Sequence, residues 1–196
     1  MRSQHCEVKY PAEIDGILRS STIGRMATNG VDGYPYITAV NYVWHEGCIY
    51  FHSARTGEKL DNILRDPKVC FEVDVPLAYI DAGYEPEKGA CGVHQFYHCV
   101  VIRGEAGVVP EGLEKTGALN ALVAAHEKRS DCPLVTDDMP AYRACTVVRI
   151  KTRSISAKSD LRQNKTPQER AALARYLMTR NRPGDQETAA AMGCPD

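Results

Sequence analysis

The chain has 196 residues, of which 43% are hydrophobic and 25% charged, a balance typical of a folded globular protein. Its 24 basic and 25 acidic residues give a formal net charge of -1, which removes the electrostatic case for nucleic acid or an anionic membrane as partner. No apolar run approaches the ~18 residues of a membrane-spanning helix, and the first residues lack a secretory apolar stretch. We therefore expect a cytoplasmic protein, whose eight scattered cysteines are reduced thiols.

The first third of the chain predicts one short helix and then strands. Pro11 suits the first position of a helix, and apolar side chains recur at helical spacing up to Ser20. Tyr34 to Trp44 is the strongest strand signal, and both of its faces carry bulky side chains. We expect both faces to be covered, one by a barrel interior and the other by a second subunit. The predicted elements are a helix at Pro11–Ser20, strands at Ser21–Thr28, Tyr34–Trp44 and Cys48–Ser53, and a tight hairpin at His45–Gly47.

The rest of the chain adds helices to further strands. Val75 to Val93 contains two prolines and three glycines, so we expect a loose insert that shapes substrate access or is only a tolerated surface insertion. Thr166 to Glu169 forms a capping box that starts a helix ending near Arg182. The remaining predicted elements are helices at Glu58–Arg65 and Leu113–His126, and strands at Lys68–Asp74, Gln95–Val109 and Cys145–Ile155, with a bend expected at Gly104.

About six strands, mostly joined by hairpins and with helices at the connections, predict a mainly β fold: a small antiparallel barrel with flanking helices. We assign the barrel domain to residues 1–160 and a C-terminal helical extension to residues 161–182. The last segment, residues 183–196, is small and polar, and we expect it to be a flexible tail.

Several common motifs are missing. There is no phosphate-binding Gly-Lys-Ser/Thr loop, no dinucleotide GxGxxG and no GxSxG nucleophile elbow. Cys91, His94, His98 and Cys99 superficially suggest zinc, but His98 and Cys99 would point to opposite faces of a strand. Four ligands could not then converge on one metal ion, so we expect no metal site.

The segment from Ile49 to Leu64 carries the clearest chemistry. A strand ending at His52 and Ser53 leads through a short loop to a helix whose first turn contains Lys59. The N-terminus of a helix presents unpaired N–H groups and suits a phosphate, to which hydroxyl and basic side chains add. The alternative is an ordinary surface helix capped by a hydroxyl, and these residues alone leave the two interpretations equally supported.

These motifs resemble those of the flavin-binding split-barrel family related to pyridoxamine 5′-phosphate oxidase, closest to its nitroimidazole-resistance branch. The resemblance covers roughly residues 10–160. Its most specific part is Phe-His-Ser-Ala at residues 51–54 followed by Gly-x-Lys-Leu at residues 57–60. Other stretches that carry it are residues 33–42, 71–73, 96–104 and 147–150, and Lys158.

The resemblance implies a split antiparallel β-barrel of FMN-binding type that forms a homodimer with FMN between the subunits. The flavin ring would lie along the strand at Ile37, Thr38, Ala39, Val40 and Asn41. His52 and Ser53 would approach the ribityl chain and phosphate, and Lys59 would pair with the phosphate. Tyr97 and His98 are candidates for contacts to the partner's flavin.

The implied activity is that of an FMN-dependent oxidoreductase that reduces nitro compounds, with NAD(P)H as a candidate electron donor. Pyridoxamine phosphate oxidation itself is disfavoured, because Trp44 is the sole tryptophan and no histidine follows Thr146. His52 is expected mainly to bind the cofactor, with proton donation as the alternative. Two rivals stay open: a non-enzymatic flavin-binding or redox-sensing dimer, and a haem protein of the same fold with His52, His98 or His126 on iron.

Overall fold

The computed structural model describes residues 4–193, and the chain divides into two compact units. The barrel unit comprises residues 18–73 and 101–155. The terminal unit comprises the described parts of residues 1–17, 74–100 and 156–196. Three long strands contribute residues to both units, so the division cuts through strands. The boundaries at 160 and 182 stay predictions.

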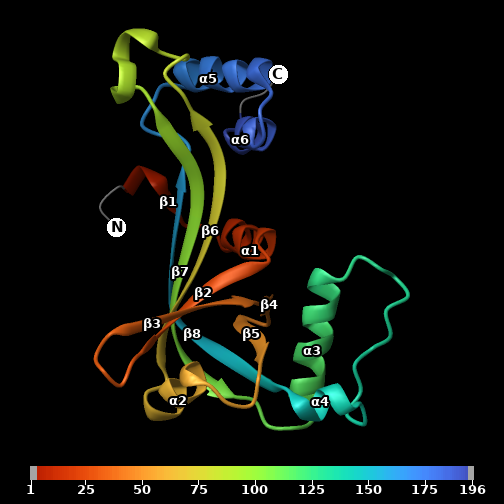
Figure 1. Ribbon diagram of the computed structural model, residues 1–196. Coiled ribbons are helices and arrows are strands. Elements are labelled where there is room, and N and C mark those ends of the chain that lie inside the picture. The colour runs from red at the N-terminus through yellow and green to blue at the C-terminus, as the bar shows by residue number, and fades with distance from the viewer. Residues whose placement is uncertain (1–3, 194–196) are drawn as a thin grey trace. The chain divides into compact units, whose positions relative to one another are not determined.

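The described elements are strands with helices between and after them (Figure 1). The strands are β1 (Glu7–Val8), β2 (Ile23–Asn29), β3 (Pro35–Asn41), β4 (Val43–His45), β5 (Cys48–Ser53), β6 (Lys68–Ile80), β7 (His94–Val108) and β8 (Thr146–Asp160). The helices are α1 (Pro11–Ser20), α2 (Glu58–Arg65), α3 (Leu113–His126), α4 (Pro140–Ala144), α5 (Pro167–Arg180) and α6 (Asp185–Ala191), with 3-10 turns at Gln4–Cys6 and Pro86–Cys91.

The strands form one sheet in the order β3-β2-β6-β7-β8-β5-β4, with β1 paired to β8. The pairings of β2 with β3 and β6, and of β5 with β4 and β8, are all antiparallel. Side chains of β2 alternate between exposed and buried, which places Met26 inside and its neighbours outside. The fold class is the predicted one: a mainly β, split antiparallel barrel with flanking helices.

The predicted strand Tyr34–Trp44 is interrupted at Tyr42 and becomes β3 and β4. The Tyr42 ring is buried edge-on against Phe71, with ring centroids 5.1 Å apart. Its hydroxyl donates a hydrogen bond to the carbonyl of Leu18 at 2.5 Å. This anchor explains the break, because the buried Tyr42 side chain is fixed to two neighbouring elements.

Two strands run further than predicted. β6 continues through the expected loose stretch to Ile80, and β8 continues past Ile155 to Asp160. Pro76 has no N–H to pair and therefore suggested a loop, but it is exposed, while Ala78 and Ile80 are buried. The insert expected at Val75–Val93 is therefore a strand up to Ile80, and only the part after it is turns and a short 3-10 segment.

The expectation of a flexible tail does not match its described part, because residues 185–191 form α6. Ala189 and Met192 belong to a buried apolar cluster with α5 and the end of β6. The Thr188 hydroxyl accepts a hydrogen bond from the backbone N–H of Ala78 at 2.8 Å. Small side chains suggested mobility, whereas here they allow α6 to pack closely; residues 194–196 lie outside the described part.

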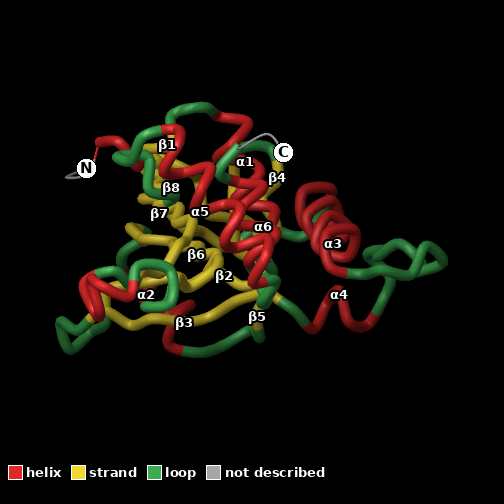
Figure 2. Tube along the Cα trace, turned by 90° about the horizontal axis from the view of Figure 1, so that it is seen from above, coloured by secondary structure: helices red, strands yellow, loops and turns green. Residues whose placement is uncertain are grey.

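α3 covers one side of the barrel unit, beside β4 and β5, and a long connection links it to α4 (Figure 2). The side chain of Glu114 near its start bonds Tyr50 and Arg149, and His126 at its end bonds the carbonyl of Tyr42 at 2.8 Å. Because a carbonyl only accepts, the His126 Nε2 carries the proton. None of the helices described in residues 4–193 is long and apolar enough to cross a membrane.

Candidate functional site

β3 is a terminal strand of the sheet, and one of its backbone edges pairs with no strand among the described residues. Its outer face is open: Ile37 is 64% exposed, and Ala39 and Asn41 are exposed as well. Thr38 and Val40 alternate with these residues and are half-buried and buried, and the Thr38 hydroxyl has no hydrogen-bond partner in the described residues. An unpaired edge beside an apolar face can accept a flat ring with hydrogen-bonding groups at its rim.

Helix α2 is fixed to the β2–β3 hairpin by polar contacts of the buried Asn62 and the exposed Arg65. The buried Asn62 amide donates to the hydroxyl of Thr28 at 3.0 Å. Arg65 bonds the side-chain oxygen of Asn62 at 2.9 Å and the backbone carbonyl of Asn29. These contacts hold the helix rigidly against the barrel, so its N-terminus has a fixed position.

The N-terminus of α2 has the features expected of an anion site. Its N-cap is Gly57, with a φ of 135°, and no side chain caps the helix. The hydroxyl-capped alternative is therefore not what the structure shows, and the first N–H groups keep their capacity to donate. Lys59 lies half-buried in the first turn, and the buried Ser53 hydroxyl has no hydrogen-bond partner among the described residues.

His52 and Asn41 bring the end of β5 and the end of β3 to one cavity of the barrel unit. His52 is exposed, in contrast to the buried Ser53 next to it. The side-chain nitrogen of Asn41 donates to the carbonyl of Thr22 at 3.0 Å, which fixes its carboxamide. The structure therefore groups Asn41 with His52 at one cavity, and their contact with a flavin stays a prediction.

Tyr97 and His98 belong to the terminal unit, on the first part of β7. The Lys158 ammonium donates to the Tyr97 hydroxyl at 2.5 Å and forms an ion pair with Asp160 at 3.1 Å. The hydrogen bond with Tyr97 is also the largest cause of the raised pKa of Lys158. His98 Nδ1 contacts the hydroxyl of Ser159 at 2.7 Å, and burial lowers the pKa of His98. The prediction that Tyr97 and His98 reach a partner's flavin stays a prediction.

The cavity itself was not predicted from the sequence. It has a volume of about 540 Å³, and most of its walls come from α3, α4 and their connection. The spacing of Leu119, Leu122, Val123 and His126 predicted α3 but not what the helix faces. No sequence pattern indicated α4, a helix of five residues. Among residues 4–193 there is no group of three or more His, Cys, Asp or Glu side chains that could hold a metal ion.

These features fit a flavin mononucleotide. The exposed face and free edge of β3 suit the ring, and the uncapped N-terminus of α2 with Lys59 suits the phosphate. The orphaned hydroxyl of Ser53 lies between the two in sequence, where the ribityl chain and phosphate are expected. A buried hydroxyl without a partner is costly, and a polar ligand atom would satisfy it.

Comparison with known families shows where the chain belongs. The family model described as pyridoxamine 5′-phosphate oxidase matches residues 11–159, so the chain belongs to this family. This match confirms the family resemblance and the flavin-binding split-barrel class. No curated protein sequence matches the chain.

Solved structures share the fold at low sequence identity. A protein from Bacteroides thetaiotaomicron assigned to 5-nitroimidazole antibiotic resistance has a TM-score of 0.66 and 18% identity, over 78% of this chain and 85% of its own. The flavocytochrome Anf3 from Azotobacter vinelandii has a TM-score of 0.67 and 15% identity, over 81% and 71%. A conserved hypothetical protein from Mycobacterium tuberculosis has a TM-score of 0.62 and 24% identity, over 81% and 89%.

Proposed function

We propose that the protein is a cytoplasmic, FMN-dependent oxidoreductase that works as a homodimer. The isoalloxazine ring lies along residues 37–41 of β3, and the phosphate binds at the N-terminus of α2. Ser53 and Lys59 contact the phosphate end of the cofactor. Two-electron transfer is the chemistry that the flavin supplies when bound, and the protein's part is to bind, orient and shield it.

The observation that carries this proposal is the uncapped start of α2. The Gly57 backbone leaves the first N–H groups without a side-chain partner, and Lys59 adds a positive charge in the same turn. The orphaned Ser53 hydroxyl precedes this turn by a short loop. Three kinds of phosphate-binding group are thus supplied within residues 53–59.

His52 is the candidate for proton handling. It is exposed at the cavity, and an imidazole can both donate and accept a hydrogen bond. Its first task in this proposal is to orient the cofactor or the acceptor by a hydrogen bond. Donating a proton to a reduced acceptor is its second task.

The homodimer is supported by the open face of β3. The apolar side chain of Ile37 on this face is 64% exposed in the single chain. A second subunit would cover that face and would bring its own Tyr97 and His98 to the flavin. Both residues are half-buried and already fixed by contacts to β8.

The acceptor class is proposed from the fold relatives. Similarity to the Bacteroides thetaiotaomicron protein favours nitro compounds as acceptors, with NAD(P)H as the electron donor. The alternative function is a flavin-binding or redox-sensing dimer that has no catalytic turnover. Oxidation of NAD(P)H by the FMN-loaded protein would support the oxidoreductase over this alternative. The haem rival is based on similarity to the flavocytochrome, and His52, His98 and His126 all stay candidate ligands. The His126 Nε2 donates to the Tyr42 carbonyl, which leaves its Nδ1 for iron.

Replacing Lys59 with Ala tests the phosphate site. We expect FMN affinity, measured by quenching of flavin fluorescence, to fall more than tenfold while the protein stays folded, because a charged hydrogen bond to the phosphate is lost. Lys151→Ala, at an exposed position on β8, is the matched control and should bind FMN within twofold of the parent. Equal affinity of Lys59→Ala and the parent would place the phosphate elsewhere.

A further inference from the structure

The cavity between α3, α4 and the barrel strands lies in the barrel unit and is independent of the terminal unit. Residues from α3, from the connection to α4 and from α4 itself line it together with Asn41 and His52. Its volume of about 540 Å³ is within the range of small-molecule sites, roughly 300–1,000 Å³. A cavity of this volume can hold a molecule with one ring or two fused rings.

The walls of the cavity are held in place by specific hydrogen bonds. Asn120 on α3 pairs twice with the backbone of Val135, at 3.0 Å and 2.7 Å, and so ties the long connection to the helix. The Tyr142 hydroxyl accepts from the backbone N–H of Gly112 at 2.8 Å, which joins α4 to the start of α3. The site is thus preformed, and binding a ligand requires little further ordering of the protein.

The lining is apolar on most of its surface and includes a few polar side chains. Its apolar side chains are Leu119, Leu122, Val123, Val135, Met139 and Ala141. The polar groups of β3 and β5 are the carboxamide of Asn41 and the imidazole of His52, both from the strands assigned to the flavin. An occupant would bury its ring against α3 and direct a hydrogen-bonding substituent toward Asn41 and His52.

Charge at the cavity selects against anions. Glu127 is among the lining residues, and no lysine or arginine is found among the described ones. One oxygen of the Glu127 carboxylate accepts from the backbone N–H groups of Lys128 and Arg129, at 2.8 Å and 2.9 Å. His126, the other imidazole in the lining, uses its Nε2 proton on the Tyr42 carbonyl. A carboxylate or phosphate would enter an apolar site without a permanent positive charge and next to a negative one, which is unfavourable.

We propose that this cavity is the binding site for the electron acceptor, an uncharged aromatic compound of one or two rings with a hydrogen-bonding substituent. The assignment rests on the proposed function, because it places the acceptor beside Asn41 and His52. It also moves substrate selection from the expected insert at residues 75–93 to α3, α4 and their connection. Val123 on α3 and Met139 at the start of α4 then determine which rings fit.

The test measures binding to the oxidised, FMN-loaded protein without reductant, using 2-naphthol as the neutral probe and 2-naphthoate as its anionic counterpart. We expect 2-naphthol to bind at least tenfold more tightly than 2-naphthoate. Val123→Trp should weaken 2-naphthol at least tenfold by filling the cavity, and Met139→Trp should do the same. Ala124→Trp, at the neighbouring exposed position of α3, should bind 2-naphthol within twofold of the parent.

The charge argument has its own variant. Glu127→Gln should improve 2-naphthoate binding several-fold and leave 2-naphthol unchanged, because only the anion meets the carboxylate. Preference for 2-naphthoate, or 2-naphthol binding that neither tryptophan variant weakens, would overturn the assignment. If both tryptophan variants lose FMN together with the probe, the cofactor itself occupies the cavity. That result would also overturn the assignment of the cavity to the electron acceptor.

Failure of the proposed function would look different. If the parent protein takes up no FMN, yet 2-naphthol binds the same chain and is lost in Val123→Trp and Met139→Trp, the flavin proposal fails. The cavity would still be established as a site for neutral aromatic compounds. FMN binding with no 2-naphthol binding would instead contradict the cavity assignment and leave the flavin site untouched.

Discussion

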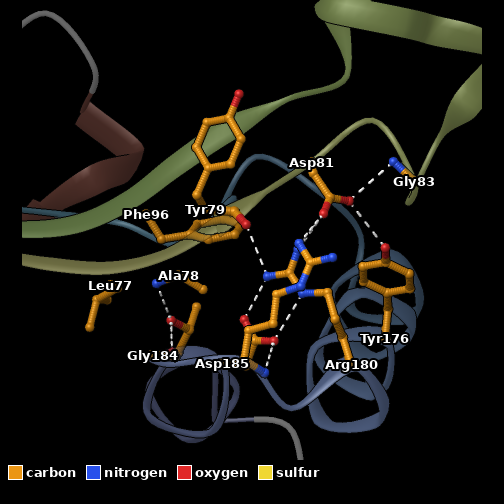
Figure 3. A network of polar contacts seen from close by, with 12 residues as sticks. Leu77, Ala78, Tyr79, Asp81, Gly83, Phe96, Tyr176, Arg180, Gly184 and Asp185 are labelled. Atoms are coloured by element: carbon orange, nitrogen blue, oxygen red, sulfur yellow. Dashed lines mark hydrogen bonds and ion pairs between the residues drawn. The ribbon is translucent and has the colours of Figure 1, made fainter.

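At the scale of single residues, Asp185 is the most completely buried charged group described, and its contacts explain how α6 is held (Figure 3). Its carboxylate accepts from Arg180 Nη2 at 2.6 Å and Nε at 2.9 Å, and from the backbone N–H of Arg182 at 2.8 Å. Arg180 also donates to the carbonyl of Tyr79 at 2.9 Å and pairs with Asp81 at 3.2 Å. This network joins α5 and α6 to the end of β6.

Replacing Asp185 with Asn should destabilise the protein by about 3 kcal/mol, because breaking a buried ion pair leaves the other charge uncompensated. Urea unfolding at pH 7 measures this change. Glu187→Gln, at an exposed position on the same helix, is the control and should change the free energy of unfolding by less than about 0.5 kcal/mol. Equal stability of Asp185→Asn and the parent would show that the network does not hold α6 in place.

The same carboxylate predicts a pH dependence. Hydrogen bonds from Arg180 are the main cause that lowers the pKa of Asp185 below its usual value. Its stabilisation is therefore fully present above the unfolded carboxyl pKa of about 3.9 and is lost as pH falls through the lower folded value. Between pH 5 and pH 3 the parent should lose more unfolding free energy than Asp185→Asn; parallel pH profiles would contradict this.

At the scale of elements, the close approach of β7 to β8 depends on Gly104. A Cβ at this position would lie 2.5 Å from the carbonyl oxygen of Lys151 and 2.7 Å from Cγ2 of Ile150. Both atoms belong to the neighbouring strand, and the backbone oxygen cannot move without disturbing the sheet. The bend expected at Gly104 stays a prediction, and the structure shows why a side chain is not accommodated there.

Gly104→Ala should lower the free energy of unfolding by about 1–3 kcal/mol, as expected for overpacking against backbone. Gly107→Ala lies on the same strand, where an added Cβ meets nothing within 4 Å, and it should be neutral or slightly stabilising. Thermal or urea unfolding of the two variants gives the comparison. If both variants are equally stable, β8 does not approach β7 at Gly104 as closely as the structure shows.

Strong local signals predicted elements well. Helices α1, α2 and α3 have the predicted bounds, and the Thr166 capping box starts α5 with both reciprocal hydrogen bonds. The ends of β6 and β8 were not predictable, because their extension depends on packing against segments distant in sequence. α6 was missed for the same reason, since its stability comes from the Arg180–Asp185 pair and from Thr188, not from its own amphipathicity.

At the scale of the whole molecule, the sequence was sufficient for the family, because the family depends on motifs local to one strand, loop and helix. The cofactor segment read from the same motifs stays a prediction. The acceptor cavity was not foreseeable. Its walls come from segments that meet only in the folded barrel unit, and Asn41 and Met139 are almost 100 positions apart in the chain. The spacing of Val123 and His126 predicted a helix, but it did not indicate which segments that helix packs against.

FMN binding by this chain underlies every functional proposal above, and its most direct measurement is an absorption spectrum. The purified protein is incubated with excess FMN, and the unbound cofactor is removed before the spectrum is recorded. We expect a flavin spectrum, and chromatography of the denatured protein should release FMN in about one equivalent per chain. A haem spectrum in the protein as purified would keep the fold but contradict the chemistry. A colourless protein that retains no FMN would contradict FMN binding itself.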